Sequence, residues 1–203
     1  MKEEEKLIRK IGLFGGSFNP IHRGHVALAK QILDKVGLDE VWFVVSPLNP
    51  LKAGASDLLA DEQRLELVQF ALCDEPHLVA CDYEFNLPKP SYTWHTLQSL
   101  QHDYPDCQFT LIIGGDNWVN FRKWYRADDI IRNYSIVVYP REGSEIKSKD
   151  LPPNVRVVRT ELYKMSSTEV RKRIREGLPV ADLLPSSSYQ KTMDYYSLPN
   201  QGK

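Results

Sequence analysis

The stretch GLFGGSFNPIHRGH, residues 12–25, crowds glycines, a serine, an Asn-Pro pair and two histidines into fourteen positions. The apolar run that leads into it predicts a β-strand over residues 7–14. The segment after it has helical spacing, which predicts a helix over residues 25–36 with Gly37 as its C-terminal stop. We therefore expect the stretch to form the corner between a strand and a helix.

This corner has the features of a phosphate site. Gly15 and Gly16 carry no side chains, so a ligand can approach the backbone closely. The helix that follows offers unpaired N–H groups and the positive end of its dipole. His22 and His25 stand three residues apart and share a helix face, which Gly24 is expected to leave open. Two imidazoles at this place suit negative charge that develops on a phosphate group.

Plainer interpretations of the corner stay open. The stretch matches neither the dinucleotide pattern GxGxxG nor the P-loop pattern GxxxxGK[ST], and a glycine-rich turn is often only a turn. The two histidines are also compatible with a metal site, although no third ligand is evident nearby, or with an exposed position. The combination of glycines and histidines at a strand-to-helix corner favours phosphate chemistry.

Outward from the corner, the chain alternates between apolar runs and segments with helical spacing. Strands rich in Val and Ile that are separated by helices predict a parallel sheet. We expect a Rossmann-like, doubly wound α/β fold with helices on both faces and a C-terminal helical segment, with ligands bound beyond the carboxyl ends of the strands. Strands are predicted at 41–47, 77–81, 108–116, 134–140 and 155–160, and helices at 61–72 with Asp61 as cap, 91–104, 127–133, 166–177 and from about Ser186.

Length and composition limit the classes of protein. The 203 residues suit a single domain over 1–203, with a C-terminal helical appendage at about 166–195. Lys and Arg number 26 and Asp and Glu 27, so we expect neither nucleic acid nor a membrane as partner. The charged N-terminus does not look like a secretory signal, and the apolar runs are too short to span a bilayer. Cys73, Cys81 and Cys107 are widely spaced and odd in number, which favours reduced thiols in the cytoplasm.

A second group of polar residues lies far downstream, in MSSTEVRKRIREG at 165–177. Ser166 and Glu169 have the spacing of a capping box, which is a sufficient structural reason for them. Ser167, Thr168 and Arg171 also place two hydroxyls and a guanidinium at a helix start, where they could hold triphosphate oxygens. This segment alone does not decide between the two interpretations.

Together the two motifs are more specific than either alone. GGSFNPIHRGH resembles the GG[ST]F[DN]PxHxGH signature of the HxGH nucleotidyltransferases, the family related to class I aminoacyl-tRNA synthetases, and MSSTEVR resembles its ISSTxxR motif. The segments SYTWHTL, GGDNWVNFRKWYRADDII and YPREG are similar to those of its bacterial nicotinate-nucleotide adenylyltransferase branch. The resemblance covers about residues 8–190. It implies transfer of the adenylyl group of ATP to nicotinic acid mononucleotide, giving deamido-NAD and pyrophosphate in NAD biosynthesis, with Mg²⁺ accompanying ATP.

The resemblance also implies roles for individual residues. His22, His25 and Arg171 would act at the reacting phosphates, and no protein residue is implied as a metal ligand. ATP or phosphate contacts are implied for Gly15, Gly16, Ser17, Lys52, Ser167 and Thr168, and nicotinate-nucleotide contacts for Thr93, Asp116, Trp124, Tyr125 and Arg141.

Three of the acceptor-side residues have simpler alternative roles. Asp116 could be a helix N-cap, Trp124 a core aromatic residue and Arg141 an exposed turn residue. The chain also departs from the family pattern, because Leu51 precedes Lys52 where PxK or PHK is usual, and His95 stands where Asp is common.

Two other functions stay open beside the implied one. The acceptor could be nicotinamide mononucleotide or phosphopantetheine, although the cluster of Trp118, Trp124 and Tyr125 favours a pyridine nucleotide over phosphopantetheine. The chain could also be a non-catalytic nucleotide-binding module, against which the two histidines, Ser167 and Arg171 argue. The sequence leaves the oligomeric state open.

Overall fold

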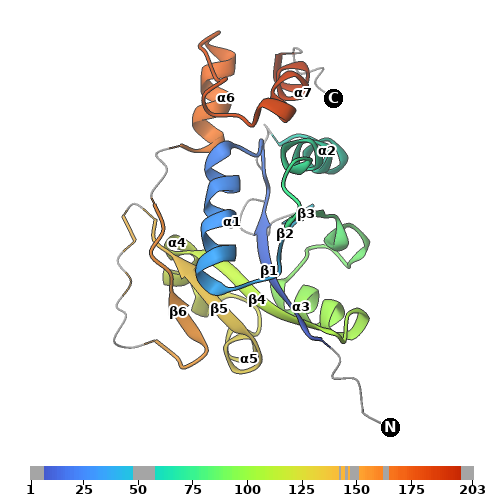
Figure 1. Ribbon diagram of the computed structural model, residues 1–203, viewed down its shortest axis with the longest axis vertical. Coiled ribbons are helices and arrows are strands. Elements are labelled where there is room, and N and C mark those ends of the chain that lie inside the picture. The colour runs from blue at the N-terminus through green and yellow to red at the C-terminus, as the bar shows by residue number, and fades with distance from the viewer. Residues whose placement is uncertain are drawn as a thin grey trace.

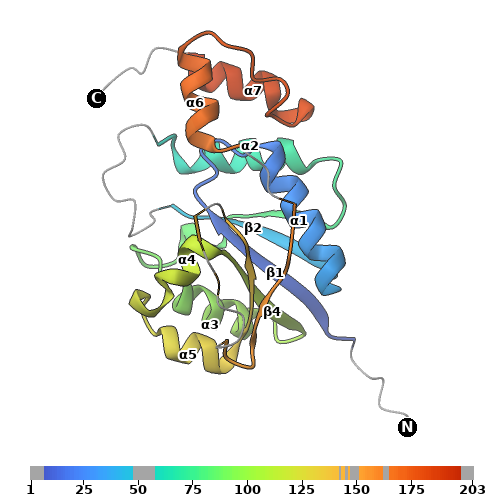
Figure 2. The same cartoon turned by 90° about the vertical axis from the view of Figure 1, so that its left-hand side faces the viewer.

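The computed structural model describes residues 7–47, 58–141, 143–144, 146, 151–161 and 165–197. Its centre is a six-stranded sheet in the order β3-β2-β1-β4-β5-β6, in which every neighbouring pair is parallel (Figures 1 and 2). The order reverses between β1 and β4, which is the arrangement of a doubly wound fold. The predicted Rossmann-like fold is therefore confirmed. The strands are β1 (Arg9–Gly16), β2 (Glu40–Val45), β3 (Leu78–Cys81), β4 (Cys107–Gly114), β5 (Ser135–Tyr139) and β6 (Val155–Val157).

Helices cover both faces of this sheet. Two of them, α3 and α5, pack on one face, and α1 and α2 pack on the other. The helices are α1 (Arg23–Val36), α2 (Asp61–Leu72), α3 (Thr93–Asp103), α4 (Gly115–Val119), α5 (Ala127–Asn133), α6 (Ser167–Arg175) and α7 (Ser186–Ser197), with short 3-10 turns η2 (Tyr83–Asn86) and η3 (Phe121–Lys123). Among these described residues, no helix has the length and apolar character needed to cross a bilayer.

Alternate residues of each strand supply two cores. On β1, Phe14 faces the layer of α1 and α2, whereas Ile11 and Leu13 face the layer of α3 and α5. Successive side chains of a strand point to opposite faces of the sheet, which produces this division. Because both faces are covered, the sequence of each strand is almost continuously apolar. The loops that connect the strands to the helices of both layers leave the sheet at the carboxyl ends of the strands. Side chains from both layers can therefore reach a ligand bound there.

The C-terminal helices α6 and α7 lie beyond the carboxyl ends of the strands, next to the start of α1 (Figure 1). They share a small apolar cluster of their own, and α7 is joined to α2 by an ion pair of 3.0 Å between Lys191 and Glu66. The cluster consists of Val170, Ile174, Val180, Leu183 and Leu184.

Several element boundaries differ from those predicted. β1 continues to Gly16 because Gly15 and Gly16 pair with Val44 and Val45 of β2, so both glycines belong to the sheet. Asp61 is the first residue of α2 and not its cap, because its carboxylate accepts a hydrogen bond from Arg64 instead. The predicted stop of α1 is confirmed, since Gly37 adopts the left-handed conformation with φ of 71°.

Candidate active site

The carboxyl ends of four neighbouring strands meet at one edge of the sheet. Gly16 ends β1, Gly114 ends β4 and Tyr139 ends β5, while Ser46 follows β2 directly. The change of strand order between β1 and β4 falls at the glycine corner, residues 15–25. Ligands of doubly wound folds bind at this place, because the loops leave the sheet there in opposite directions.

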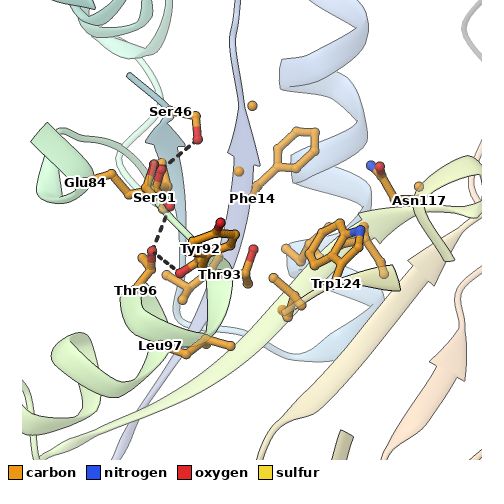
Figure 3. A pocket seen from close by; sticks show the side chains of 18 of the residues that line it. Phe14, Ser46, Glu84, Ser91, Tyr92, Thr93, Thr96, Leu97, Asn117 and Trp124 are labelled. Carbon is orange, nitrogen blue, oxygen red and sulfur yellow. Dashed lines mark hydrogen bonds between the residues drawn. The ribbon is translucent and has the colours of Figure 1, made fainter. Parts of the chain in front are cut away.

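A cavity of about 190 Å³ opens at this edge (Figure 3). Gly15 faces open space, since a Cβ atom built there would meet no atom within 4 Å. Gly16 has a different reason to be glycine, because a Cβ atom there would lie 2.9 Å from the ring of Phe18. Of the residues predicted to bind ligands, Gly15, Gly16, Thr93, Trp124 and Tyr125 line the cavity.

Trp124 packs against Phe121 with ring centroids 5.0 Å apart, as its alternative role as a core aromatic residue predicts, and it also lines the cavity. Its backbone N–H donates to the carbonyl of Phe121 over 2.9 Å, so that amide is already engaged. The amide of Tyr125 makes no hydrogen bond within the described part of the chain. His95, the departure from the family pattern, packs its ring against Tyr125 and Tyr92 beside the cavity.

Two buried polar atoms of the cavity lining have no hydrogen-bond partner among the described residues. They are the Oγ of Ser91 and the Nε1 of Trp124. An unpaired buried donor is costly and is usually explained by water or a ligand. The two atoms therefore mark places where a bound molecule could accept a hydrogen bond.

His22 and His25 stand together at the start of α1, as predicted. His22 is the N-cap residue, and its ring stacks on that of His25 with centroids 3.7 Å apart. The His22 backbone N–H donates to Nδ1 of His25 over 3.2 Å, which places the proton of a neutral His25 ring on Nε2. The expected open face over Gly24 is wrong, because Met165 covers this glycine and its sulfur accepts a hydrogen bond from the Gly24 amide.

The charge on His22 is suppressed. Burial, and to a smaller extent the positive charge of Arg141, lower the pKa of His22 from 6.5 to about 4. Arg141 pairs with Asp116, with Nε and Oδ1 3.8 Å apart, and its Nη2 donates to the hydroxyl of Tyr139 over 3.1 Å. Asp116 is exposed in the first turn of α4 and does not cap it, because Gly114 is the N-cap residue. Asp116 and Arg141 thus form a polar pair beside the cavity.

The downstream motif, residues 165–177, lies against the glycine corner. Ser166 caps α6 by accepting from the Glu169 amide, as the capping interpretation predicts, although the Glu169 carboxylate binds Arg173 instead of closing the box. Ser167 Oγ donates to the carbonyl of Pro20 over 2.9 Å, and Arg171 Nη1 donates to the carbonyl of Asn19 over 2.7 Å.

These contacts join the two motifs, although Arg171 and Asn19 are 152 positions apart in the sequence. They also give Ser167 and Arg171 a structural role at the corner that phosphate binding alone does not predict. Thr168 is exposed at the first turn of α6.

Phosphate contacts are also predicted for Ser17 and Lys52. Ser17 lies in the corner, and its carbonyl accepts a hydrogen bond of 2.7 Å from Arg64. Lys52 and the neighbouring Leu51 lie outside the described residues. Within the described ranges, no three His, Cys, Asp or Glu side chains gather around a place that could hold a metal ion.

Residues that support the site were missed in the sequence. Arg64 is fully buried and binds the carbonyls of Ser17 and Leu59, and Glu84 is buried beside the cavity. Asn19 Oδ1 accepts from the Leu59 amide and from the Tyr196 hydroxyl of α7. For Arg64 the available signal was its helical spacing, because it stands three and four residues before Leu67 and Val68 and so shares their buried face of α2.

The chain is similar to known proteins over most of its length. Residues 13–173 match the model of the cytidylyltransferase-like family. The chain is 46% identical over 182 residues to a probable nicotinate-nucleotide adenylyltransferase of Bacteroides fragilis, covering 90% of each chain. It is 44% identical over 190 residues to the protein of the same name from Cytophaga hutchinsonii, covering 93% of this chain and 98% of the relative.

Among solved structures, the chain is similar to the nicotinic acid mononucleotide adenylyltransferase of Plasmodium falciparum complexed with NaAD. The TM-score is 0.79 at 17% identity, and the alignment covers 94% of this chain and 98% of that one. At this identity the similarity concerns the fold.

Proposed function

The chain belongs to the cytidylyltransferase-like family and, within it, to the nicotinate-nucleotide adenylyltransferases, and from this premise we propose that it transfers the adenylyl group of ATP to nicotinic acid mononucleotide. The products would be deamido-NAD and pyrophosphate, and the reaction would serve NAD biosynthesis. The reduced cysteines expected from the sequence are consistent with the cytoplasm as its place of action.

The reaction asks for positioning and charge stabilisation more than for proton transfer. The acceptor phosphate is already an anion, so it can attack the α-phosphorus of ATP in line while pyrophosphate leaves. No general base is needed. The protein must hold two anions close together and offset the charge on the five-coordinate phosphorus.

The residues at the corner suit this task. Nε2 of His25 carries the ring proton in the neutral state and would donate to a phosphate oxygen. His22 is neutral at pH 7 without ligand, so it would contribute a hydrogen bond and not a full positive charge. Arg171 and Ser167, which donate to carbonyls of the corner backbone, would also bind the triphosphate. Gly15, Gly16, Ser17, Thr168 and Lys52 complete the proposed phosphate contacts.

The acceptor would occupy the cavity. Its pyridine ring would lie between Thr93 and the pair Trp124 and Tyr125. Its phosphate would face Arg141, and its ribose would face Asp116. Mg²⁺ remains part of the proposal as the companion of ATP, with phosphate oxygens as its ligands, since hard oxygen anions are the ligands it prefers. It would neutralise charge on the triphosphate.

One observation carries the proposal: a stacked histidine pair and an apolar, aromatic cavity meet at the same strand ends. The test is pyrophosphate release from ATP with nicotinic acid mononucleotide, nicotinamide mononucleotide and phosphopantetheine as acceptors, and chromatographic identification of the product. We expect deamido-NAD and the highest kcat/KM with the nicotinate acceptor. Turnover only with phosphopantetheine, or with none of the three, would overturn the proposal.

A further inference from the structure

Glu84 places a carboxylate inside the molecule at the side of the cavity opposite Trp124 (Figure 3). It lies in η2 and is 7% exposed. Its Oε2 accepts a hydrogen bond of 2.6 Å from Ser46 Oγ, and its Oε1 accepts one of 2.8 Å from Thr96 Oγ1. A carboxylate removed from water is tolerated only with such donors.

The two hydroxyls come from different walls of the cavity. Ser46 follows the last residue of β2, and Thr96 stands in the first turn of α3, three residues after Thr93. Each hydroxyl has one proton to donate. Ser46 Oγ has the Glu84 carboxylate as its acceptor, and Thr96 Oγ1 lies closer to this carboxylate, at 2.8 Å, than to the carbonyl oxygen of Tyr92, at 3.3 Å. Glu84 therefore fixes the separation between the end of β2 and the first turn of α3.

Ser46 extends this connection to the glycine corner. Its backbone N–H donates to the carbonyl of Gly16 over 3.0 Å. A continuous path of hydrogen bonds thus runs from Gly16 through Ser46 and Glu84 to Thr96. It joins the corner proposed to hold ATP to the helix turn proposed to hold the acceptor.

We propose that Glu84 is a positioning residue that holds the glycine corner and the first turn of α3 in the alignment required for adenylyl transfer. This inference rests on the proposed function. In-line attack requires the acceptor phosphate and the α-phosphorus to stand at near-attack distance, and a displacement of about 1 Å can cost on the order of 100-fold in rate. Binding of either substrate alone does not need this alignment. Glu84 acts through Ser46 and Thr96 and touches neither reacting atom.

The test is steady-state kinetics of Glu84→Gln at a temperature where circular dichroism shows the variant folded. The amide keeps the shape but offers one acceptor oxygen, so one of the two hydroxyls loses its partner. We expect kcat to fall about 10- to 100-fold, with both KM values within about threefold of wild type. Ser46→Ala, which keeps the carboxylate, should lower kcat in the same direction, and it carries the test if Glu84→Gln does not fold.

A double-mutant cycle distinguishes alignment from general destabilisation. If Glu84 acts through Ser46, the double variant should be no slower than Glu84→Gln by more than about twofold, because both changes break the same path. Glu66→Gln is the matched control, since this carboxylate bonds Lys191 and Tyr195 on the surface away from the cavity, and it should keep wild-type kinetics.

Three results would overturn the inference: normal kcat in both folded single variants, a change confined to the KM of one substrate, or fully multiplicative effects in the cycle. If the wild type uses another acceptor of the panel, the proposed acceptor is wrong. The same comparison of kcat with that acceptor then decides the role of Glu84.

Discussion

His22 shows how burial sets the chemistry of a single residue. Its pKa of about 4 means that the folded protein keeps the ring neutral where the unfolded chain, with a pKa near 6.5, binds a proton. Between about pH 4 and pH 6.5, the unfolded state binds more protons at His22 than the folded state does. The free energy of unfolding must therefore fall as the pH falls through this range. Above about pH 7 both states are neutral and the effect vanishes.

We therefore predict that wild-type protein loses about 2 kcal/mol of unfolding free energy through His22 alone between pH 7.5 and pH 5. The variant His22→Gln, which cannot titrate, should lose correspondingly less over the same interval. Urea unfolding at the two pH values measures both quantities. Equal pH dependence in the two proteins would show that His22 is not held neutral.

Ser91 is a buried hydroxyl without a partner among the described residues, at the wall of the cavity. Its removal costs no internal hydrogen bond, so Ser91→Ala should unfold at the wild-type urea concentration or slightly above it. If the hydroxyl serves the acceptor, the KM for nicotinic acid mononucleotide should rise about 2- to 10-fold, the worth of one neutral hydrogen bond.

Ser188 provides a matched control for this prediction. It is also buried, but its Oγ already donates to the carbonyl of Pro185, and neither residue lines the cavity. Ser188→Ala should lose stability and leave the KM unchanged. An unaltered KM in Ser91→Ala would leave the hydroxyl without a role in acceptor binding.

At the scale of elements, the buried guanidinium of Arg64 connects α2 to the glycine corner by hydrogen bonds. Arg64 is 0% exposed, and it donates to Ser17 O at 2.7 Å, Leu59 O at 3.1 Å and Asp61 Oδ1 at 2.6 Å. Arg64→Met keeps the apolar stem and removes the donor from the carbonyls of Ser17 and Leu59, whereas the Asp61 carboxylate keeps Lys89 as a partner at 3.6 Å. We predict a loss of about 3 kcal/mol in unfolding free energy, since each buried carbonyl left without a donor costs about 1–3 kcal/mol.

The control is Arg132→Met on α5, whose ion pair with Asp129 is exposed. Surface pairs of this kind contribute little, so its urea midpoint should match wild type. Similar midpoints for the two variants would mean that Arg64 does not fasten α2 to the corner.

The elements themselves could be predicted from the sequence because local patterns specify them. The six strands and the six longer helices were all expected, since apolar runs and helical spacing are properties of neighbouring residues. The helix starts were less predictable. Asp61 looks like a cap, yet Arg64 takes its carboxylate, and His22 takes the cap position of α1 although imidazole is an unusual residue there.

The supporting contacts of the site could not be predicted, because their partners are remote in sequence. Arg64 binds Ser17 across 47 positions, and Glu84 binds Ser46 across 38. Only the sheet order brings these residues together. The histidine pair and the cavity aromatics were found because they belong to contiguous motifs, whereas Glu84 stands in a short turn with no repeating pattern.

At the scale of the whole molecule, two segments that are distant in the sequence line the cavity proposed to hold the acceptor: the first turn of α3, with Thr93, and the segment after η3, with Trp124 and Tyr125. Trp124 can stack on a pyridinium ring, a contact worth roughly 0.5–2 kcal/mol that nicotinate and nicotinamide nucleotides share equally. Discrimination must come from donors that face the ring carboxylate. The Trp124 amide already donates to Phe121, so the Tyr125 amide and the Thr93 hydroxyl remain as candidates, beside Ser91 Oγ and Trp124 Nε1, which have no partner among the residues that the structure describes. A carboxylate can accept hydrogen bonds at both oxygens, whereas the NH₂ of the amide cannot accept one. One protein donor would therefore stay unpaired when nicotinamide mononucleotide binds, which favours the acid.

We predict that the wild type prefers nicotinic acid mononucleotide, and that Trp124→Ala weakens both acceptors by about 2- to 30-fold while much of the preference persists. Thr93→Val, which keeps the shape and removes one donor, should lower kcat/KM for the acid more than for the amide, and so reduce the ratio. Measuring kcat/KM for both acceptors in the three proteins tests each part. If Thr93→Val keeps the full ratio and Trp124→Ala abolishes it, the indole and not the donor set reads the ring substituent. Its buried Nε1, which has no partner within the described chain, would then be the group to examine.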